Sequence, residues 1–179
     1  MLLIKNGCIH DAVNKEPYIA DIVVGNGKIT AINTGTMISG ALPDSIDNSE
    51  VEVLDIKGLN VYPGLVDAHS HLGLDGYAIG FESQDYNEMN DIVTPQLRAI
   101  DGFYPQDETV KLAREGGVTC VGTGPGSSNV LGGMFMAVKT YGHRVDDMVV
   151  KFPVAMKCAF GENPKRCYKD KGNYSRMTT

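Results

Sequence analysis

The sequence lacks three features that would each point to a particular class of protein. Its Lys and Arg residues are scattered and outnumbered by acidic residues, 16 against 22, so no basic stripe is present to bind nucleic acid. No segment approaches the roughly 20 apolar residues that cross a bilayer, and the apolar start of the chain is interrupted too early for a signal peptide. The four cysteines include no Cys-x-x-Cys pair, which fits a reducing compartment. We therefore expect a soluble, cytoplasmic protein without a nucleic-acid or membrane partner.

The first 58 residues carry the signals of short strands. These signals lie at residues 2–7, 20–32 and 51–58. The middle segment is predicted to fold back at Asn26-Gly27, because both central positions of a type I′ turn need positive φ. The polar stretch 33–50 contains Gly, Pro and Ser and is expected to be a surface loop. Residues 1–58 are therefore predicted to form a small β module.

From residue 59 onward the pattern changes to strand followed by helix. Residues 59–71 form an apolar run that ends in polar residues, as a buried parallel strand does. Residues 104–117 predict a helix, with acidic residues in the first turn and two glycines at the end. Strands are predicted again within VTCVGTGPG, residues 118–126, and MVVKFPVAMKCAFG, residues 148–161. The βαβ order favours a parallel sheet in an α/β fold.

Three polar side chains end the first of these strands. Asp67, His69 and His71 alternate with other residues, so they share one face of a strand. If that face is buried, hydrogen bonds or a metal must compensate the three groups. Imidazole is a good ligand for zinc and similar ions, and Asp67 is placed to orient a ligand without binding the metal itself. The alternative is a solvated pair of histidines at a strand end.

The segment around these histidines resembles a known family. PGLVDAHSH, residues 63–71, is similar to the first barrel strand of the amidohydrolase superfamily, where Pro-Gly, two apolar residues and Asp precede His-x-His. Two later segments, GVTCVGTGPGSSNVLGG (117–133) and MKCAFGENPKR (156–166), look like the imidazolonepropionase-like branch. The resemblance covers most of the chain and implies a hydrolase of cyclic or linear amides.

The resemblance also implies a fold and a cofactor. It implies the first part of a (β/α)8 TIM barrel, residues 59–179, preceded by a β-sandwich module, with one or two divalent ions at the barrel mouth and zinc as the expected metal. The metal lowers the pKa of a water molecule that attacks the amide carbon. His69 and His71 match the first two ligands. The other histidine ligands and the aspartate that acts as general base have no counterpart and are expected beyond Thr179.

The third ligand in such enzymes is a glutamate or a carboxylated lysine, and two residues compete for this place. Glu162 follows the last predicted strand, where barrel strands deliver catalytic groups. Lys157 lies deeper and has the opposite parity, so a regular strand cannot point both inward. We prefer Glu162. The alternatives are an exposed loop carboxylate for Glu162 and an ordinary surface lysine for Lys157.

Four further residues are candidates for substrate binding. The glycines of residues 122–126 have G-x-G-x-G spacing, which is not that of a dinucleotide-binding loop. In a barrel loop after the second strand, Ser127, Ser128 and Asn129 would line the substrate cavity, or the glycines merely form turns. Arg98 would pair with a substrate carboxylate, although a surface salt bridge is the alternative.

Chain length limits what this sequence does alone. The residues from 60 onward are fewer than half of the about 250 that such a barrel takes, so we expect an incomplete barrel without activity of its own. We expect it to self-associate or to bind the missing C-terminal part. Two other classes stay open. One is a cupin-like barrel, which also uses His-x-His followed by an acidic residue, here Asp75; the other is a non-catalytic scaffold of the same fold.

Overall fold

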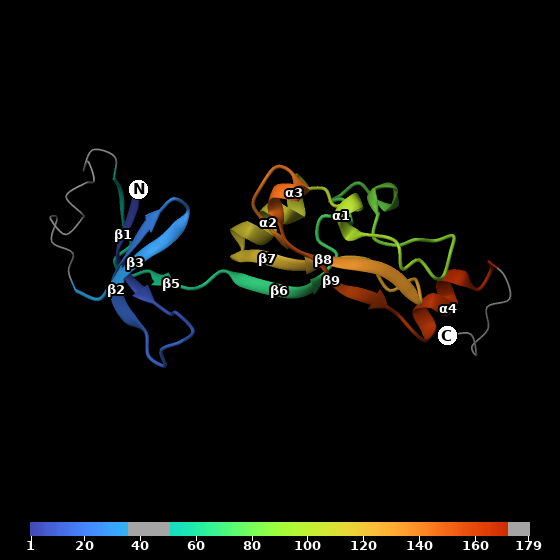
Figure 1. Ribbon diagram of the computed structural model, residues 1–179, viewed down its shortest axis with the longest axis horizontal. Coiled ribbons are helices and arrows are strands. Elements are labelled where there is room, and N and C mark those ends of the chain that lie inside the picture. Colours follow the sequence, from blue (N-terminus) through green and yellow to red (C-terminus); the bar gives the residue numbers. More distant parts are fainter. Residues whose placement is uncertain (36–50, 172–179) are drawn as a thin grey trace. The chain divides into compact units, whose positions relative to one another are not determined.

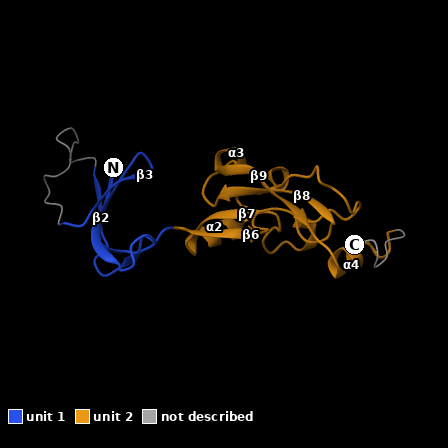
Figure 2. Ribbon diagram, turned by 60° about the horizontal axis from the view of Figure 1, so that its bottom comes forward, with its two compact units in different colours: residues 1–63 blue, residues 64–179 orange. Residues whose placement is uncertain are grey.

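The computed structural model describes residues 1–35 and 51–171. It divides into two units, Met1–Pro63 and Gly64–Thr179, coloured separately in Figure 2. Most of the loop predicted at residues 33–50 lies outside the described residues. In the described residues, no helix is long and apolar enough to cross a membrane.

The first unit is a five-stranded sheet in the order β3-β2-β1-β4, with β5 also pairing with β1. The hairpin strands β1, β2 and β3 are antiparallel, whereas β4 and β5 run parallel to β1. Buried Ile9, Ala20 and Ile22 form its core. The strands are β1 (Leu2–Ile9), β2 (Tyr18–Gly25), β3 (Lys28–Asn33), β4 (Glu52–Asp55) and β5 (Asn60–Val61).

The turn between β2 and β3 lies where the sequence predicted it. Asn26 has φ 52° and Gly27 has φ 71°. Two successive residues with positive φ are what a type I′ turn requires, and its twist suits an antiparallel hairpin. The predicted hairpin is therefore confirmed.

The second unit contains a four-stranded sheet in the order β6-β7-β8-β9 (Figure 1). Strand β6 runs parallel to β7, whereas β8 is antiparallel to both of its neighbours. Strands β6, β7 and β9 therefore share one direction, with β8 reversed between the last two. The strands are β6 (Leu65–Ser70), β7 (Val118–Thr123), β8 (Leu131–Lys139) and β9 (Val149–Cys158).

Short helices pack on this sheet. Helix α2 contacts β7, and α1 and α3 contact β8. Apolar side chains between these elements form the core, in which Val110 of α2, Val121 of β7 and Met136 of β8 are almost fully buried. Burial of one such side chain stabilises the fold by about 1.5–3 kcal/mol. The helices are η2 (Phe81–Ser83), α1 (Ala99–Gly102), α2 (Glu108–Glu115), α3 (Val145–Met148) and α4 (Glu162–Tyr168).

The sequence predicted part of this arrangement. The strand–helix–strand unit β6–α2–β7 is present, with the parallel pairing that the βαβ order indicates. This mixed α/β unit differs from a cupin barrel, whose strands are antiparallel. Strand β8 was not predicted; it begins at Leu131, soon after the loop of Ser127, Ser128 and Asn129, and pairs with both β7 and β9.

We expect replacement of Asp107 to destabilise the second unit. The Asp107 carboxylate caps α2 by accepting the backbone N–H of Thr109 at 2.7 Å, and it also accepts the N–H of Tyr77 at 3.1 Å. Its side chain is buried, so Asp107→Ala leaves two donors poorly paired and should lower the free energy of unfolding by about 2 kcal/mol.

Urea unfolding measures this effect, with Glu115→Ala at the exposed end of the same helix as the control. The control should change stability by less than about 0.5 kcal/mol. Equal effects of the two substitutions would contradict the capping role of Asp107.

Candidate metal centre

The two histidines of the His-x-His segment lie together at the end of β6. His69 is in the strand and His71 is the first residue after it. Their ring centroids are 5.7 Å apart, and both rings approach the Phe135 ring of β8 edge-on, at 5.1 Å and 6.5 Å. The strand period therefore brings both imidazoles to one side of the sheet, as the sequence predicted.

A hydrogen bond fixes the tautomer of His71. Its Nδ1 lies 2.7 Å from the carbonyl oxygen of Gly124, just after β7. A carbonyl oxygen only accepts, so the neutral ring carries its hydrogen on Nδ1 and presents an unprotonated Nε2. Histidines that bind metals commonly have their second nitrogen held in this way.

His69 faces a buried lysine of β9. Lys157 Nζ lies 3.2 Å from His69 Nε2, and the Lys157 residue is only 9% exposed. An ammonium group can only donate, so His69 accepts through Nε2 and also presents its lone pair to a cation. The positive charge of Lys157, followed by burial and by His71, lowers the pKa of His69. Burial likewise lowers the pKa of Lys157.

This set of donors fits a divalent cation of the zinc type. Two imidazoles offer their Nε2 lone pairs from one side of the sheet, and nitrogen ligands suit zinc. Within residues 1–35 and 51–171, no group of three or more His, Cys, Asp and Glu side chains gathers to hold an ion. The side chain in contact with His69 is Lys157.

The structure does not bring Glu162 to the two histidines, and this changes our preference for the third ligand. Strand β9 ends at Cys158, three residues before the end of the segment 148–161 in which it was predicted. Gly161 then takes a φ of 83°, and Glu162 begins α4 with an exposed side chain. Because Glu162 lies outside the strand, strand parity does not apply to it; Lys157 is the one of the two residues that contacts His69.

Asp67 lies on β6 two residues before His69. Its Oδ1 accepts the backbone N–H of His69 at 3.1 Å. This bond fixes the backbone that carries the imidazole, and the negative charge of Asp67 acts against the fall in the pKa of His69. The predicted role of Asp67 in orienting a ligand stays a prediction.

The three polar residues of the loop after β7 are more buried than the sequence suggested. Ser128 is buried and its Oγ accepts the Cys167 thiol at 3.6 Å, while Ser127 is half-buried. Asn129 is fully buried and its amide donates within the protein, to Tyr168 Oη among others. The structure thus gives Asn129 a role in holding loops together, in place of the exposed position that a substrate contact needs.

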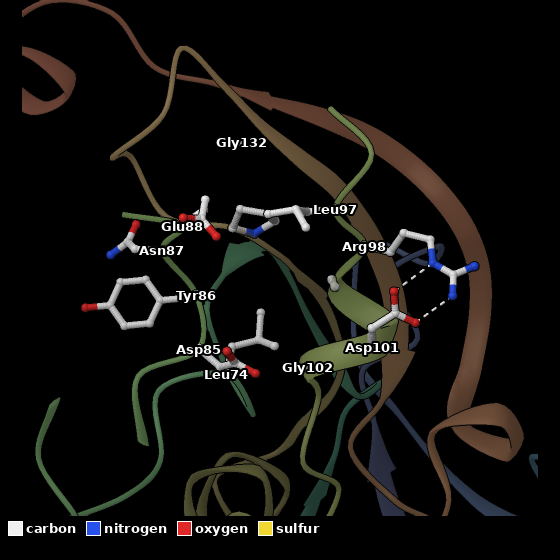
Figure 3. A pocket seen from close by; sticks show the side chains of 12 residues that line it. Leu74, Asp85, Tyr86, Asn87, Glu88, Leu97, Arg98, Asp101, Gly102 and Gly132 are labelled. Carbon is white, nitrogen blue, oxygen red and sulfur yellow. Dashed lines mark hydrogen bonds and ion pairs between the residues drawn. The ribbon is translucent and has the colours of Figure 1, made fainter. Parts of the chain in front are cut away.

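A cavity of about 250 Å³ lies between the segment of Asp85 to Glu88 and that of Leu97 to Gly102 (Figure 3). Tyr86 lines it and also stacks on the His71 ring, with 5.3 Å between centroids. Arg98 lies at this cavity, but its guanidinium forms two hydrogen bonds with Asp101, of 2.8 Å and 2.6 Å. Both side chains are about half exposed, so the salt bridge that the sequence offered as the alternative for Arg98 is present.

Sequence reasoning missed two aromatic residues of the site. Phe135 touches both imidazoles, but it lies in the strand that was not predicted. Tyr86 lies 15 residues beyond His71 in a segment without regular secondary structure. No periodicity connects it to the histidines, so only the fold reveals the contact.

Comparison with known proteins identifies the family. No protein-family profile matches the chain. Amidohydrolase tasK of Hapsidospora irregularis is 32% identical over 162 residues, covering 84% of this chain and 16% of that protein. N-substituted formamide deformylase of Arthrobacter pascens is 31% identical over 101 residues, covering 56% of this chain and 16% of that protein.

A solved structure agrees. The crystal structure of an amidohydrolase from Thermotoga maritima matches with a TM-score of 0.85 and 37% identity, over 99% of this chain and 44% of that one. The chain therefore belongs to the amidohydrolase superfamily, as its resemblance predicted. It spans less than half the length of these relatives, and its place in the imidazolonepropionase-like branch stays a prediction.

We expect removal of the Lys157 charge to raise the pKa of His69 in the chain without added metal. Lys157→Met removes the largest cause of the lowered pKa, so His69 should titrate closer to the ordinary value of about 6.5. A histidine with a lowered folded pKa contributes stability above its unfolded pKa and loses it as the pH falls. The loss of stability below about pH 6.5 should therefore be smaller in the variant.

NMR titration of the His69 ring measures the shift. Lys151→Met, an exposed lysine of the same strand, is the matched control and should leave the His69 pKa unchanged. An unchanged His69 pKa in Lys157→Met would contradict the contact.

Proposed function

We propose that this chain supplies part of the active site of a metal-dependent amidohydrolase that hydrolyses the C–N bond of a cyclic or linear amide. The observation that carries the proposal is the pair of neighbouring imidazoles: His71 is bound through Nδ1 to Gly124 O, which leaves its Nε2 unprotonated, and His69 Nε2 lies beside buried Lys157. Membership in the superfamily supports it, and one relative is named a deformylase of N-substituted formamides.

His69 and His71 would hold the ion through Nε2, and carboxylated Lys157 would provide the third ligand. In carboxylation, the neutral amine of Lys157 adds to CO2 and loses one proton, which gives a carbamate with two oxygen ligands. Burial lowers the pKa of Lys157 and so favours the neutral amine that this reaction needs. A divalent cation such as zinc, when bound, polarises the amide carbonyl and lowers the pKa of a water molecule.

The other residues of the site orient these groups. The Gly124 carbonyl keeps the hydrogen of His71 on Nδ1, and the Asp67 carboxylate holds the backbone of His69. We place the remaining histidine ligands and the aspartate that acts as general base on the other strands of a (β/α)8 barrel. The active site of the complete enzyme would then combine residues of β6 to β9 with residues of the remaining barrel strands.

The cavity next to Tyr86 offers room for the substituent of the amide. Its volume of about 250 Å³ suits a small group. Leu74 and Leu97 provide apolar contacts, while Asp85 and Glu88 add carboxylates. Since Asp101 already pairs with Arg98, the lining carries an excess of negative charge, and a neutral or cationic substituent fits it better than a carboxylate.

In the complete enzyme, we expect Lys157→Met to remove metal and activity. The double variant His69→Ala with His71→Ala should have the same effect. The neutral thioether side chain cannot form a carbamate, so at least one ligand is lost. Metal analysis and amide turnover measure the outcome, with Lys151→Met as the matched control on the same strand.

Glu162→Gln tests the competing ligand in the same assays, and it should retain metal. Wild-type enzyme prepared without bicarbonate should regain metal content and activity when bicarbonate is added. Loss of metal in Glu162→Gln but not in Lys157→Met would restore Glu162 as the ligand and contradict the proposal.

We expect the 179-residue chain alone to be inactive and to associate. Two histidines and one lysine leave the ion with few ligands and no general base from the described residues, and zinc should bind weakly. Strands β6 and β9 each have only one partner in the described sheet and carry exposed apolar residues such as Val66 and Val154. Such edges recruit other chains.

Assays of the chain with added zinc against N-substituted amides, and its mass in solution, measure both expectations. Metal-dependent turnover by a monomer would contradict them, because it would require a general base within these residues.

A further inference from the structure

Two contacts hold the His71 ring. Its Nδ1–H donates to Gly124 O at 2.7 Å, and the Tyr86 ring stacks on it, with 5.3 Å between centroids and 13° between planes. The hydrogen bond alone allows the imidazole to rock about the N–H···O line. A ring stacked on the face removes that motion, and the direction of Nε2 is then defined.

One segment of the chain holds both partners of this stack. Gly124 accepts from His71, and two residues later the Gly126 N–H donates to Tyr86 O at 2.6 Å. The approach of the Tyr86 loop requires a glycine at this position, because a Cβ on Gly126 would lie 2.6 Å from Tyr86 Cδ2. The loop and the histidine are therefore placed relative to each other through the same stretch of backbone.

A buried hydrogen-bond cluster fixes the residues that follow Tyr86. The Asn129 amide nitrogen lies within hydrogen-bond distance of three oxygens, the carbonyls of Glu88 and Asp91 at 3.0 Å and 2.7 Å and Tyr168 Oη at 2.8 Å, and its two N–H groups donate among them. The Tyr168 hydroxyl lies 2.6 Å and 2.8 Å from the same two carbonyls. Asn129 and Tyr168 are both fully buried, so a broken bond here costs about 1–3 kcal/mol. Helix α4 thereby holds residues 86–91 against the loop after β7.

From these contacts we infer that Tyr86 is a positioning residue for His71. Asn129 and Tyr168 hold the Tyr86 loop where the Tyr86 ring stacks on His71. The consequence for metal binding rests on the proposed function. In the chain without metal, the stack keeps the His71 ring in the orientation in which its Nδ1–H donates to Gly124 O, and this bond holds the Nδ1–H tautomer. In the loaded enzyme the same stack would hold Nε2 toward the ion.

The test compares Tyr86→Leu, which keeps apolar bulk but removes the flat ring, with Tyr86→Phe, which keeps the ring. Nitrogen chemical shifts of the His71 imidazole in the metal-free chain report the tautomer. Wild type and Tyr86→Phe should show the Nδ1–H form, whereas Tyr86→Leu should populate both tautomers. Tyr104→Leu, an exposed tyrosine, is the control and should behave as wild type.

A second variant acts through the loop rather than the ring. Tyr168→Phe deletes one hydroxyl without creating a large cavity, and it should change the His71 tautomer in the same direction but less strongly. If Tyr86→Leu fails to fold, this variant decides the question. An unchanged His71 tautomer in the folded variants would overturn the inference, because the hydrogen bond to Gly124 would then suffice.

Affinity for Co²⁺, measured by absorption, separates this inference from the proposed function. The dissociation constant should rise about tenfold in Tyr86→Leu and less than twofold in Tyr86→Phe, since groups that orient a ligand contribute about 10–100-fold. Equal affinity in wild type and Tyr86→Leu would overturn positioning while leaving the metal site intact. A wild-type complete enzyme that binds no Co²⁺ would contradict the proposed function, whereas the tautomer measurement on the metal-free chain still decides positioning.

Discussion

The site depends on three glycines at the end of β7, Gly122, Gly124 and Gly126. A Cβ on Gly122 would collide with the carbonyl oxygen of Ala68, so glycine lets β7 approach β6 closely. A Cβ on Gly124 would collide with the ring of Phe135, and one on Gly126 would collide with Asn87 and Tyr86. Three parts of the chain thus converge on residues 122–126, and the histidines, Phe135 and the Tyr86 loop meet there. The glycines serve close packing of backbone rather than binding of a phosphate.

Local sequence patterns predicted the features that depend on neighbouring residues. The Asn26-Gly27 hairpin, the capped helix α2 and the shared side of His69 and His71 all follow from short-range rules. Strand β8 was not predicted because its second and third residues are Gly132 and Gly133, which are typical of a loop. Gly133 has φ 119°, and pairing with β7 and β9 makes the segment a strand. Such pairing is non-local, so propensity does not report it.

Local sequence patterns do not determine which of Lys157 and Glu162 lies beside the histidines. Parity holds only within a strand, and Glu162 lies beyond the end of β9, so parity does not decide between the two residues. The place of Glu162 depends on where the strand stops and on the turn at Gly161, which carries Glu162 into α4. Lys157, the last residue but one of β9, contacts His69.

The charge of Lys157 opposes binding of a metal ion at His69. Lys157 Nζ lies 3.2 Å from the lone pair with which His69 would bind an ion, so an ammonium group and a divalent cation cannot share that place. Burial already disfavours the lysine charge, and the charge in turn lowers the pKa of His69. Conversion of Lys157 to a carbamate removes this cation and puts an anion there instead. On the proposed function, binding of the metal and of CO2 at Lys157 are therefore coupled, because each removes the electrostatic cost that opposes the other.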